Sequence, residues 1–310
     1  MNDNYHKPTV NRAPDWWQHP IQAWIDLSDF YSDDGLTNPA NWRRLNQGQT
    51  NYNYELTLTG KNHKKNYFVQ VVNINNLAML PQGDKDQAVQ PVLSYLANKS
   101  SIEPWLVDCY LCTPSIRVFD WVNFKPLTAN CFNPELSSSQ DLAYPFTGCD
   151  AFLLTVVDFM TSLHDLEASS QQQQPVRLDI QKHLRGYHQL AKEHAPEHSK
   201  TIERLLTQSL PIAEKFSPDK FCHNDLSLNN LLWIGEQGRL KVIDWEYACF
   251  SDPTMDLAGF LLNFQLNSQQ QQHFVEQYST KTGTQINPDK LRNMKQLCQN
   301  ISALWQFCSS

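Results

Sequence analysis

The stretch from residue 221 to residue 246 constrains this chain most strongly, because it sets polar residues at fixed intervals inside an apolar frame. It reads FCHNDLSLNNLLWIGEQGRLKVIDWE. Residues 230–234 and 240–243 are apolar runs on either side of a Gly-containing turn, which is the pattern of two antiparallel strands. The sequence therefore predicts a hairpin with Asn230 near its start and Asp244 just past its end.

Four polar residues of this stretch have the spacing of a phosphoryl-transfer loop. His223, Asp225 and Asn230 follow the pattern H-x-D-x-x-x-x-N, in which the Asp accepts or orients a substrate hydroxyl proton and the Asn binds Mg²⁺. Asp244 adds a carboxylate, and Mg²⁺ prefers such oxygen ligands. We therefore expect Asp225 to act as general base, Asn230 and Asp244 to hold the metal, and His223 to brace the loop. The alternative is that these residues only form turns or satisfy the core.

The motifs HNDLSLNNLLW, VIDWEYA and DPTMDLA together resemble the choline kinase and aminoglycoside phosphotransferase superfamily, most closely its bacterial choline-kinase-like and thiamine-kinase-like members. The resemblance extends roughly from Arg44 onward. It implies an α+β, protein-kinase-like bilobal fold and Mg-ATP-dependent phosphorylation of a small-molecule hydroxyl. It also implies that Asp256 braces the backbone of the catalytic loop, although capping the following helix is an equally compatible role.

Three segments follow from the changes of pattern along the chain. Residues 1–43 are expected to form an N-terminal helical extension, whose Trp residues favour packing on a lobe over binding a partner. Residues 44–122 form a strand-rich lobe with one helix and end in an apolar run that, by resemblance, borders adenine. Residues 123–310 form a mainly helical lobe that carries the catalytic loop and the acceptor site.

The predicted nucleotide loop precedes the alternating run at 52–58, which indicates a strand. Gly48, Thr50 and Asn51 lie just before it, where the resemblance places the loop over the nucleotide phosphates. A lone Gly is a weak phosphate-loop signal, so an ordinary hairpin turn remains the alternative.

The chain departs from the kinase pattern at the basic residue that pairs with the phosphates. The strand predicted at 67–72 has Gln70 where such kinases place Lys or Arg, and the following helix has Gln87 at the matching Glu position. Two amides can satisfy each other without charge. We therefore expect weakened nucleotide binding, or another cation, such as Lys64 or Lys65, reaching the site.

The acceptor is constrained less than the reaction. A quaternary ammonium alcohol favours aromatic faces and a carboxylate, through cation–π attraction of about 0.5–2 kcal/mol per contact. Trp245, Glu246, Tyr247 and Trp305 are the candidates, with core packing as the alternative for each aromatic residue. Choline is favoured modestly, and thiamine, ethanolamine or a sugar-like alcohol remain possible.

Composition narrows the remaining classes. The 310 residues carry a net charge of −7, which disfavours nucleic-acid binding, and we expect no membrane partner. The eight cysteines show no disulfide framework, so a cytoplasmic protein with free thiols is expected. Cys109 and Cys112 form a C-x-x-C in a strand-like run without the second pair of a zinc site. A nucleotide-binding pseudokinase or interaction protein is the second functional hypothesis, motivated by Gln70 and Gln87.

Overall fold

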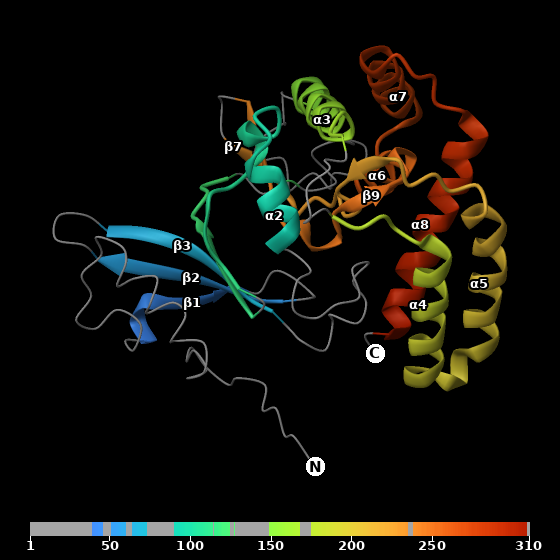
Figure 1. Ribbon diagram of the computed structural model, residues 1–310, viewed down its shortest axis with the longest axis horizontal. Coiled ribbons are helices and arrows are strands. Elements are labelled where there is room, and N and C mark those ends of the chain that lie inside the picture. Colours follow the sequence, from blue (N-terminus) through green and yellow to red (C-terminus); the bar gives the residue numbers. More distant parts are fainter. Residues whose placement is uncertain are drawn as a thin grey trace, which may run out of the picture. The chain divides into compact units, whose positions relative to one another are not determined.

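The computed structural model describes residues 39–45, 51–59, 64–72, 90–113, 115–124, 127, 149–167, 175–234 and 238–308. The chain divides into two compact units (Figure 1), of which the first spans Met1–Ala78, Asp84–Gln90 and Val107–Asn123, and the second Met79–Gly83, Pro91–Leu106 and Phe124–Ser310. Residues 91–106 are therefore part of the second unit, whereas the sequence assigned them to the strand-rich segment.

The first unit is built on a five-stranded antiparallel sheet with the strand order β1-β2-β3-β5-β4. The strands predicted at 52–58 and 67–72 are confirmed, and the second begins three residues earlier than expected. The elements are η2 (Pro39–Asn41), β1 (Trp42–Leu45), β2 (Tyr52–Thr59), β3 (Lys64–Val71), β4 (Cys109–Cys112) and β5 (Ile116–Asp120).

One face of this sheet is apolar and forms the core of the first unit. In β3 the residues Tyr67, Val69 and Val71 are buried, because side chains alternate between the two faces of a strand. Trp42 joins them from β1, with its ring edge-on to Tyr54 at a centroid distance of 6.0 Å. The prediction that Trp42 belongs to a helical extension is therefore wrong, since this residue begins a strand. The other Trp residues of the extension lie outside the described residues.

The second unit is mainly helical (Figure 1) and carries two small sheets, β6 with β9 and β7 with β8. Its helices are α2 (Gln90–Ala97), whose first residue belongs to the first unit, η4 (Glu103–Trp105), α3 (Cys149–His164), α4 (Ile180–His194), η7 (Pro196–His198), α5 (Ser199–Ala213), η8 (Trp245–Tyr247), α6 (Pro253–Asn263), α7 (Ser268–Thr282) and α8 (Pro288–Cys308). Its strands are β6 (Lys220–Cys222), β7 (Leu231–Ile234), β8 (Arg239–Val242) and β9 (Cys249–Ser251).

The predicted hairpin is present as β7 and β8. Leu231 lies opposite Val242 and Ile234 opposite Arg239 in antiparallel register. Gly238 has a φ of 62°, a left-handed backbone that glycine adopts without strain. Because the buried faces of both strands join the largest core cluster, the hairpin is held against the helices of its own unit.

Helix α3 confirms the helical period expected from residue 151. Phe152, Val156, Phe159 and Leu163 are fully buried on one face, as three-to-four-residue spacing requires. The helix ends at His164. In the described parts of the chain no helix is long and apolar enough to cross a membrane.

Candidate active site

The loop between β6 and β7 folds back on itself and brings Asp225 beside Asn230. Asn224 has a φ of 63°, in the left-handed region that Asn tolerates better than most other residues. Its Nδ2 donates to the carbonyl of Tyr247 at 3.0 Å. Further along, the amide of Asn230 donates to the carbonyl of Ser227 at 3.1 Å, which closes the turn before β7.

Asp225 is held by the side chain of Asn230. The Asn230 Nδ2 donates to the backbone carbonyl of Asp225 at 2.9 Å and to its Oδ2 at 2.8 Å. Burial raises the pKa of Asp225 to about 6, the Asn230 hydrogen bond opposes this, and the charges of Glu246 and Asp256 add to it. A carboxylate whose pKa lies near neutrality is suited to general-base work.

The carboxylate of Asp256 holds the backbone of the loop that carries Asp225. Its Oδ2 accepts from the amide of His223 at 2.8 Å, and its Oδ1 accepts from the amide of Asn224 at 2.6 Å. Burial opposes ionisation of Asp256, but the hydrogen bond and charge of His164 outweigh it and the pKa is lowered. The alternative of an N-cap does not hold, because Asp252 caps α6 by accepting from the amide of Thr254 at 3.0 Å.

The brace continues into two helices of the second unit. The Nε2 of His164, at the end of α3, lies 3.1 Å from Asp256 Oδ2. Since the carboxylate can only accept, Nε2 carries a proton, and Nδ1 shares a hydrogen bond with the hydroxyl of Tyr278 in α7 at 2.7 Å. The sequence pointed to Asp256 but not to Tyr278, because nothing local relates a residue of α7 to the catalytic loop.

His223 is neutral in this arrangement. Its Nε2 donates to the carbonyl of Ile243 at 3.0 Å, and its Nδ1 accepts from the amide of Asp225 at 3.3 Å. Burial lowers the pKa of His223, although the charge of Asp256 opposes this. The imidazole thus bonds the catalytic loop to the strand end that precedes Asp244.

Asn230 and Asp244 lie at the same end of the hairpin. The amide of Ile243 donates to the carbonyl of Asn230 at 3.0 Å, so Asp244 follows directly on the residue paired with Asn230. Asp244 has a φ of 65°, an uncommon backbone for a non-glycine residue that clusters at functional sites. Because the side-chain Nδ2 of Asn230 donates to Asp225, the side-chain Oδ1 of Asn230 is the atom suited to bind a metal. One amide oxygen and one carboxylate fit Mg²⁺, which keeps waters and phosphates as its other ligands.

The acceptor candidates fall into different environments. Trp245 is a core residue. Its ring centroid lies 4.7 Å from that of His223, and its Nε1 donates to the backbone carbonyl of Val242 at 3.2 Å. Its expected contact with the acceptor is therefore replaced by core packing, the alternative foreseen for it. Trp305, on α8, packs at the edge of the second core cluster. Glu246 is 2% exposed. Burial raises the pKa of Tyr247, and the negative charge of Glu246 raises it further.

A tyrosine that the sequence did not single out joins Glu246 and Tyr247. Tyr187, on α4, shares a hydroxyl hydrogen bond with Tyr247. Burial raises its pKa, and the negative charges of Asp225 and Glu246 raise it further. Asp225, Glu246 and the two tyrosines therefore form one electrostatically coupled group, which we call the acidic-tyrosine cluster.

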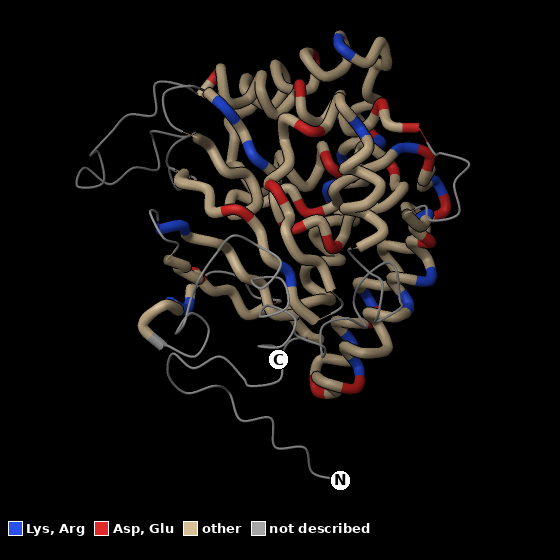
Figure 2. The backbone as a smooth tube through the Cα atoms, turned by 60° about the vertical axis from the view of Figure 1, so that its left-hand side comes forward, with Lys and Arg blue, Asp and Glu red and all other residues tan. Residues whose placement is uncertain are grey.

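Elsewhere along the described backbone, basic and acidic residues are interspersed (Figure 2).

The residues expected on the nucleotide side are only partly described. Gly48, Thr50 and Gln87 lie outside the described residues, and Asn51 precedes β2. Gln70 is on β3, 5% exposed, and its Oε1 accepts from the Nη1 of Arg117 at 2.5 Å. The basic residue beside Gln70 is therefore on β5. The sequence did not point to Arg117, because the two residues meet only through the pairing of β3 with β5.

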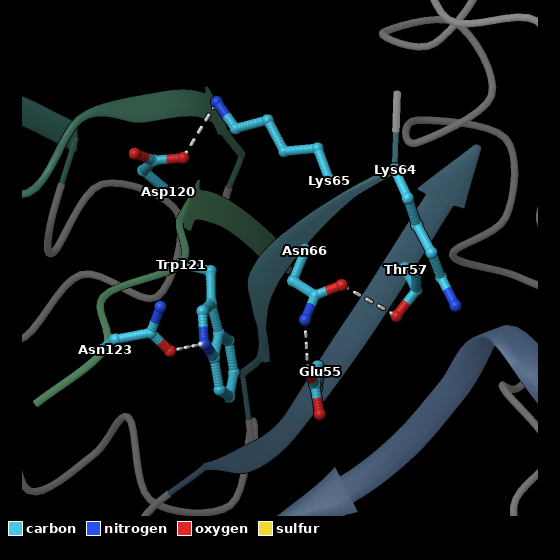
Figure 3. A pocket seen from close by; sticks show the side chains of 8 residues that line it. All are labelled: Glu55, Thr57, Lys64, Lys65, Asn66, Asp120, Trp121 and Asn123. Atoms are coloured by element: carbon cyan, nitrogen blue, oxygen red, sulfur yellow. Dashed lines mark hydrogen bonds and ion pairs between the residues drawn. The ribbon is translucent and has the colours of Figure 1, made fainter. Parts of the chain in front are cut away.

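A polar pocket of about 650 Å³ lies on the first unit (Figure 3). Asn66 Nδ2 donates to Glu55 at 2.7 Å, and Trp121 Nε1 donates to Asn123 at 3.0 Å. Trp121 belongs to the run that the resemblance placed beside adenine. The lining residues are Glu55, Thr57, Lys64, Lys65, Asn66, Asp120, Trp121 and Asn123.

Part of the chain matches a family of known proteins. Residues 143–293, which include the catalytic loop and the hairpin, match the phosphotransferase enzyme family. The protein LicA of Haemophilus influenzae is 34% identical over 90 residues, which are 27% of this chain and 32% of that protein. The chain thus matches about a third of the length of this relative.

Solved structures share the fold over most of the chain. Choline kinase LicA from Streptococcus pneumoniae gives a TM-score of 0.66 at 20% identity, covering 93% of this chain and 88% of that one. LicA in complex with AMP gives 0.64 at 20% identity, covering 94% and 90%. Aminoglycoside-3'-phosphotransferase of type VIII gives 0.60 at 15% identity, covering 92% and 99%. The chain therefore has a kinase-like fold, and residues 143–293 of it match the phosphotransferase enzyme family.

Proposed function

We propose that this chain transfers a phosphoryl group from Mg-ATP to the hydroxyl of a small, cationic amino alcohol of the choline type. The observation that carries the proposal is the position of Asp225, a carboxylate with a raised pKa, hydrogen-bonded to Asn230 and next to the hairpin end that holds Asp244. In this proposal Asp225 accepts or orients the hydroxyl proton of the acceptor. Asn230 and Asp244 hold Mg²⁺, which neutralises phosphate charge when bound.

The braces around the loop support this assignment. Phosphoryl transfer depends on positioning more than on covalent chemistry. Asp256 fixes two consecutive loop amides, and His223 ties the loop to the strand end before Asp244. Both contacts leave the Asp225 carboxylate available to a substrate while restricting the backbone that carries it.

The acidic-tyrosine cluster supports a cationic acceptor. A buried carboxylate at Glu246 would attract a quaternary ammonium, and the faces of Tyr187 and Tyr247 would add cation–π attraction of about 0.5–2 kcal/mol per contact. The names of the structural neighbours agree with this, since LicA is a choline kinase. Thiamine and ethanolamine also carry a positive charge and remain alternative acceptors.

Release of ADP with Mg-ATP tests the proposal, with choline, ethanolamine, thiamine and an aminoglycoside as acceptors. We expect choline-dependent turnover that Asp225→Asn abolishes and that Asp150→Asn, an exposed carboxylate on α3, leaves unchanged. The neutral alcohol 3,3-dimethylbutan-1-ol has the shape of choline without its charge. Equal kcat/KM for these two alcohols would refute a cation-selective site.

A second candidate function is nucleotide binding without catalysis, favoured by the neutral Gln70 on β3. In that case Mg-ATP binds, no acceptor of the panel stimulates ADP release, and Asp225→Asn leaves nucleotide binding unchanged. Turnover with any alcohol rules this candidate out.

A further inference from the structure

Arg117 and Gln70 form a cross-strand pair on the face of the sheet opposite to its apolar core. They are directly opposite in the β3–β5 register, so their side chains project from the same face. The guanidinium donates to the Gln70 amide oxygen at 2.5 Å, and the two residues are 3% and 5% exposed. A positive charge therefore lies beside the β3 position at which kinases carry their phosphate-binding Lys.

Neither lysine expected from the sequence can take this place. Lys65 is five residues from Gln70, so it projects from the opposite face of β3, and it pairs with Asp120 at 2.9 Å. Lys64 shares the face of Gln70 but is six residues away, which is about 20 Å along a strand. That separation exceeds the reach of a lysine side chain.

The geometry of the pair suits a phosphate ligand. Gln70 is a neutral acceptor, so this contact orients the guanidinium and brings no negative charge to it. Arginine binds phosphate oxygens through two parallel N–H donors, and such charge-assisted bonds are roughly twice as strong as neutral ones. The guanidinium on β5 thus supplies the positive charge, and the amide on β3 holds it in position.

Glu55, Thr57 and Asn66, which line the polar pocket of Figure 3, lie on the same face of the sheet as Gln70. Asn66 is four residues from Gln70 on β3, so both project from one face, about 13 Å apart along the strand. A nucleoside with its first phosphates is of comparable length. A base beside Trp121 and phosphates at Arg117 would therefore occupy one face of the first unit.

We propose that Arg117 binds the nucleotide phosphates in place of a basic residue on β3, and that Gln70 positions its guanidinium. This inference rests on the proposed use of Mg-ATP. In this arrangement the phosphate-binding cation lies on β5, and the neutral Gln70 on β3 supports it. Gln70 is then no sign that the site has lost nucleotide binding.

Isothermal titration of full-length protein with Mg-ATP and with adenosine tests the inference. Arg117→Gln should weaken Mg-ATP binding about tenfold to a hundredfold, the loss expected for hydrogen bonds to a charged group, and leave adenosine binding unchanged. The double variant Gln70→Arg with Arg117→Gln moves the cation to β3 and should recover most of the affinity. Arg44→Gln, an exposed arginine on β1, is the matched control and should bind both ligands as the wild type does.

Three outcomes overturn the inference. If Arg117→Gln binds Mg-ATP as tightly as the wild type, Arg117 is not the phosphate cation, while acceptor-dependent turnover would leave the proposed function standing. If Mg-ATP and adenosine weaken equally and the double variant recovers neither, the residue supports only the fold. If the wild type binds no Mg-ATP, both the inference and the proposed function fail. Should Arg117→Gln not fold, Arg117→Lys and the double variant, checked by thermal melting, make the same comparison.

Discussion

Replacing Asp225 by Asn should remove catalysis and at the same time stabilise the folded protein at neutral pH. Burial raises the pKa of Asp225 to about 6 in the folded protein. An Asp in an unfolded chain titrates near about 4, and one pKa unit corresponds to about 1.4 kcal/mol. Ionising Asp225 therefore costs the folded state up to about 3 kcal/mol, which a neutral Asn avoids.

The sign of the effect defines the pH window. Below about pH 4 Asp225 is protonated in both states, so its raised pKa removes no stability. Between about pH 4 and pH 6 the unfolded chain ionises first, and the wild type loses stability as the pH rises. Above that window the loss is constant. Since the Asn oxygen can still accept from Asn230, the advantage of Asp225→Asn should grow across the window and then level off.

Urea unfolding of the two proteins without Mg²⁺ or nucleotide measures this difference from about pH 4 to about pH 7. Turnover of Asp225→Asn should fall by about 10²–10⁴-fold at the same pH. Asp150→Asn serves as the control, since its carboxylate is exposed. A stability difference that does not increase with pH would refute the reasoning that burial raises the pKa of Asp225.

Three further outcomes follow from the site. Asp256→Asn places an N–H donor opposite the N–H of a loop amide. It should destabilise the fold by about 3–5 kcal/mol, the usual cost of breaking a buried charged network. The midpoint of urea unfolding measures this loss, and an unchanged midpoint would contradict it. Asp244→Asn removes the proposed metal carboxylate, so the Mg²⁺ concentration for half-maximal ADP release should rise at least about tenfold, and an unaltered Mg²⁺ dependence would exclude this ligand. The Cys109 hydrogen bond and the charge of Arg117 lower the pKa of Cys112. Mg-ATP at Arg117 should raise that pKa and slow alkylation of Cys112, as mass spectrometry would show, and an alkylation rate indifferent to Mg-ATP would argue against phosphate at Arg117.

The local features of the chain were predictable because their causes lie within a few residues. The β7–β8 hairpin follows from apolar runs around glycines, and α3 follows from its apolar spacing. The loop was singled out by the separation of His223, Asp225 and Asn230, since backbone geometry limits where residues two and seven positions apart can lie. Trp42 was misassigned because a Trp among polar residues carries no period that separates a helix from a strand.

Long-range partners were not predictable from the same information. Whether Asp256 capped a helix or braced a loop depended on His223 and Asn224, more than thirty residues earlier in the chain. Tyr187 joined the acidic-tyrosine cluster from a helix whose sequence gives no sign of chemistry. Such contacts depend on how helices and strands pack, which a single sequence does not state.

The sequence by itself determined where Asp225, Asn230 and Asp244 lie, on a loop and at one end of a hairpin, because their separations along the chain are short and the apolar runs between them form strands. Only the tertiary structure decided which groups surround these residues and shift their pKa values. Burial of Asp225 raises its pKa, and the register of β3 against β5 sets Arg117 beside Gln70. Burial and register are properties of packed chains, since both depend on residues that meet only after folding.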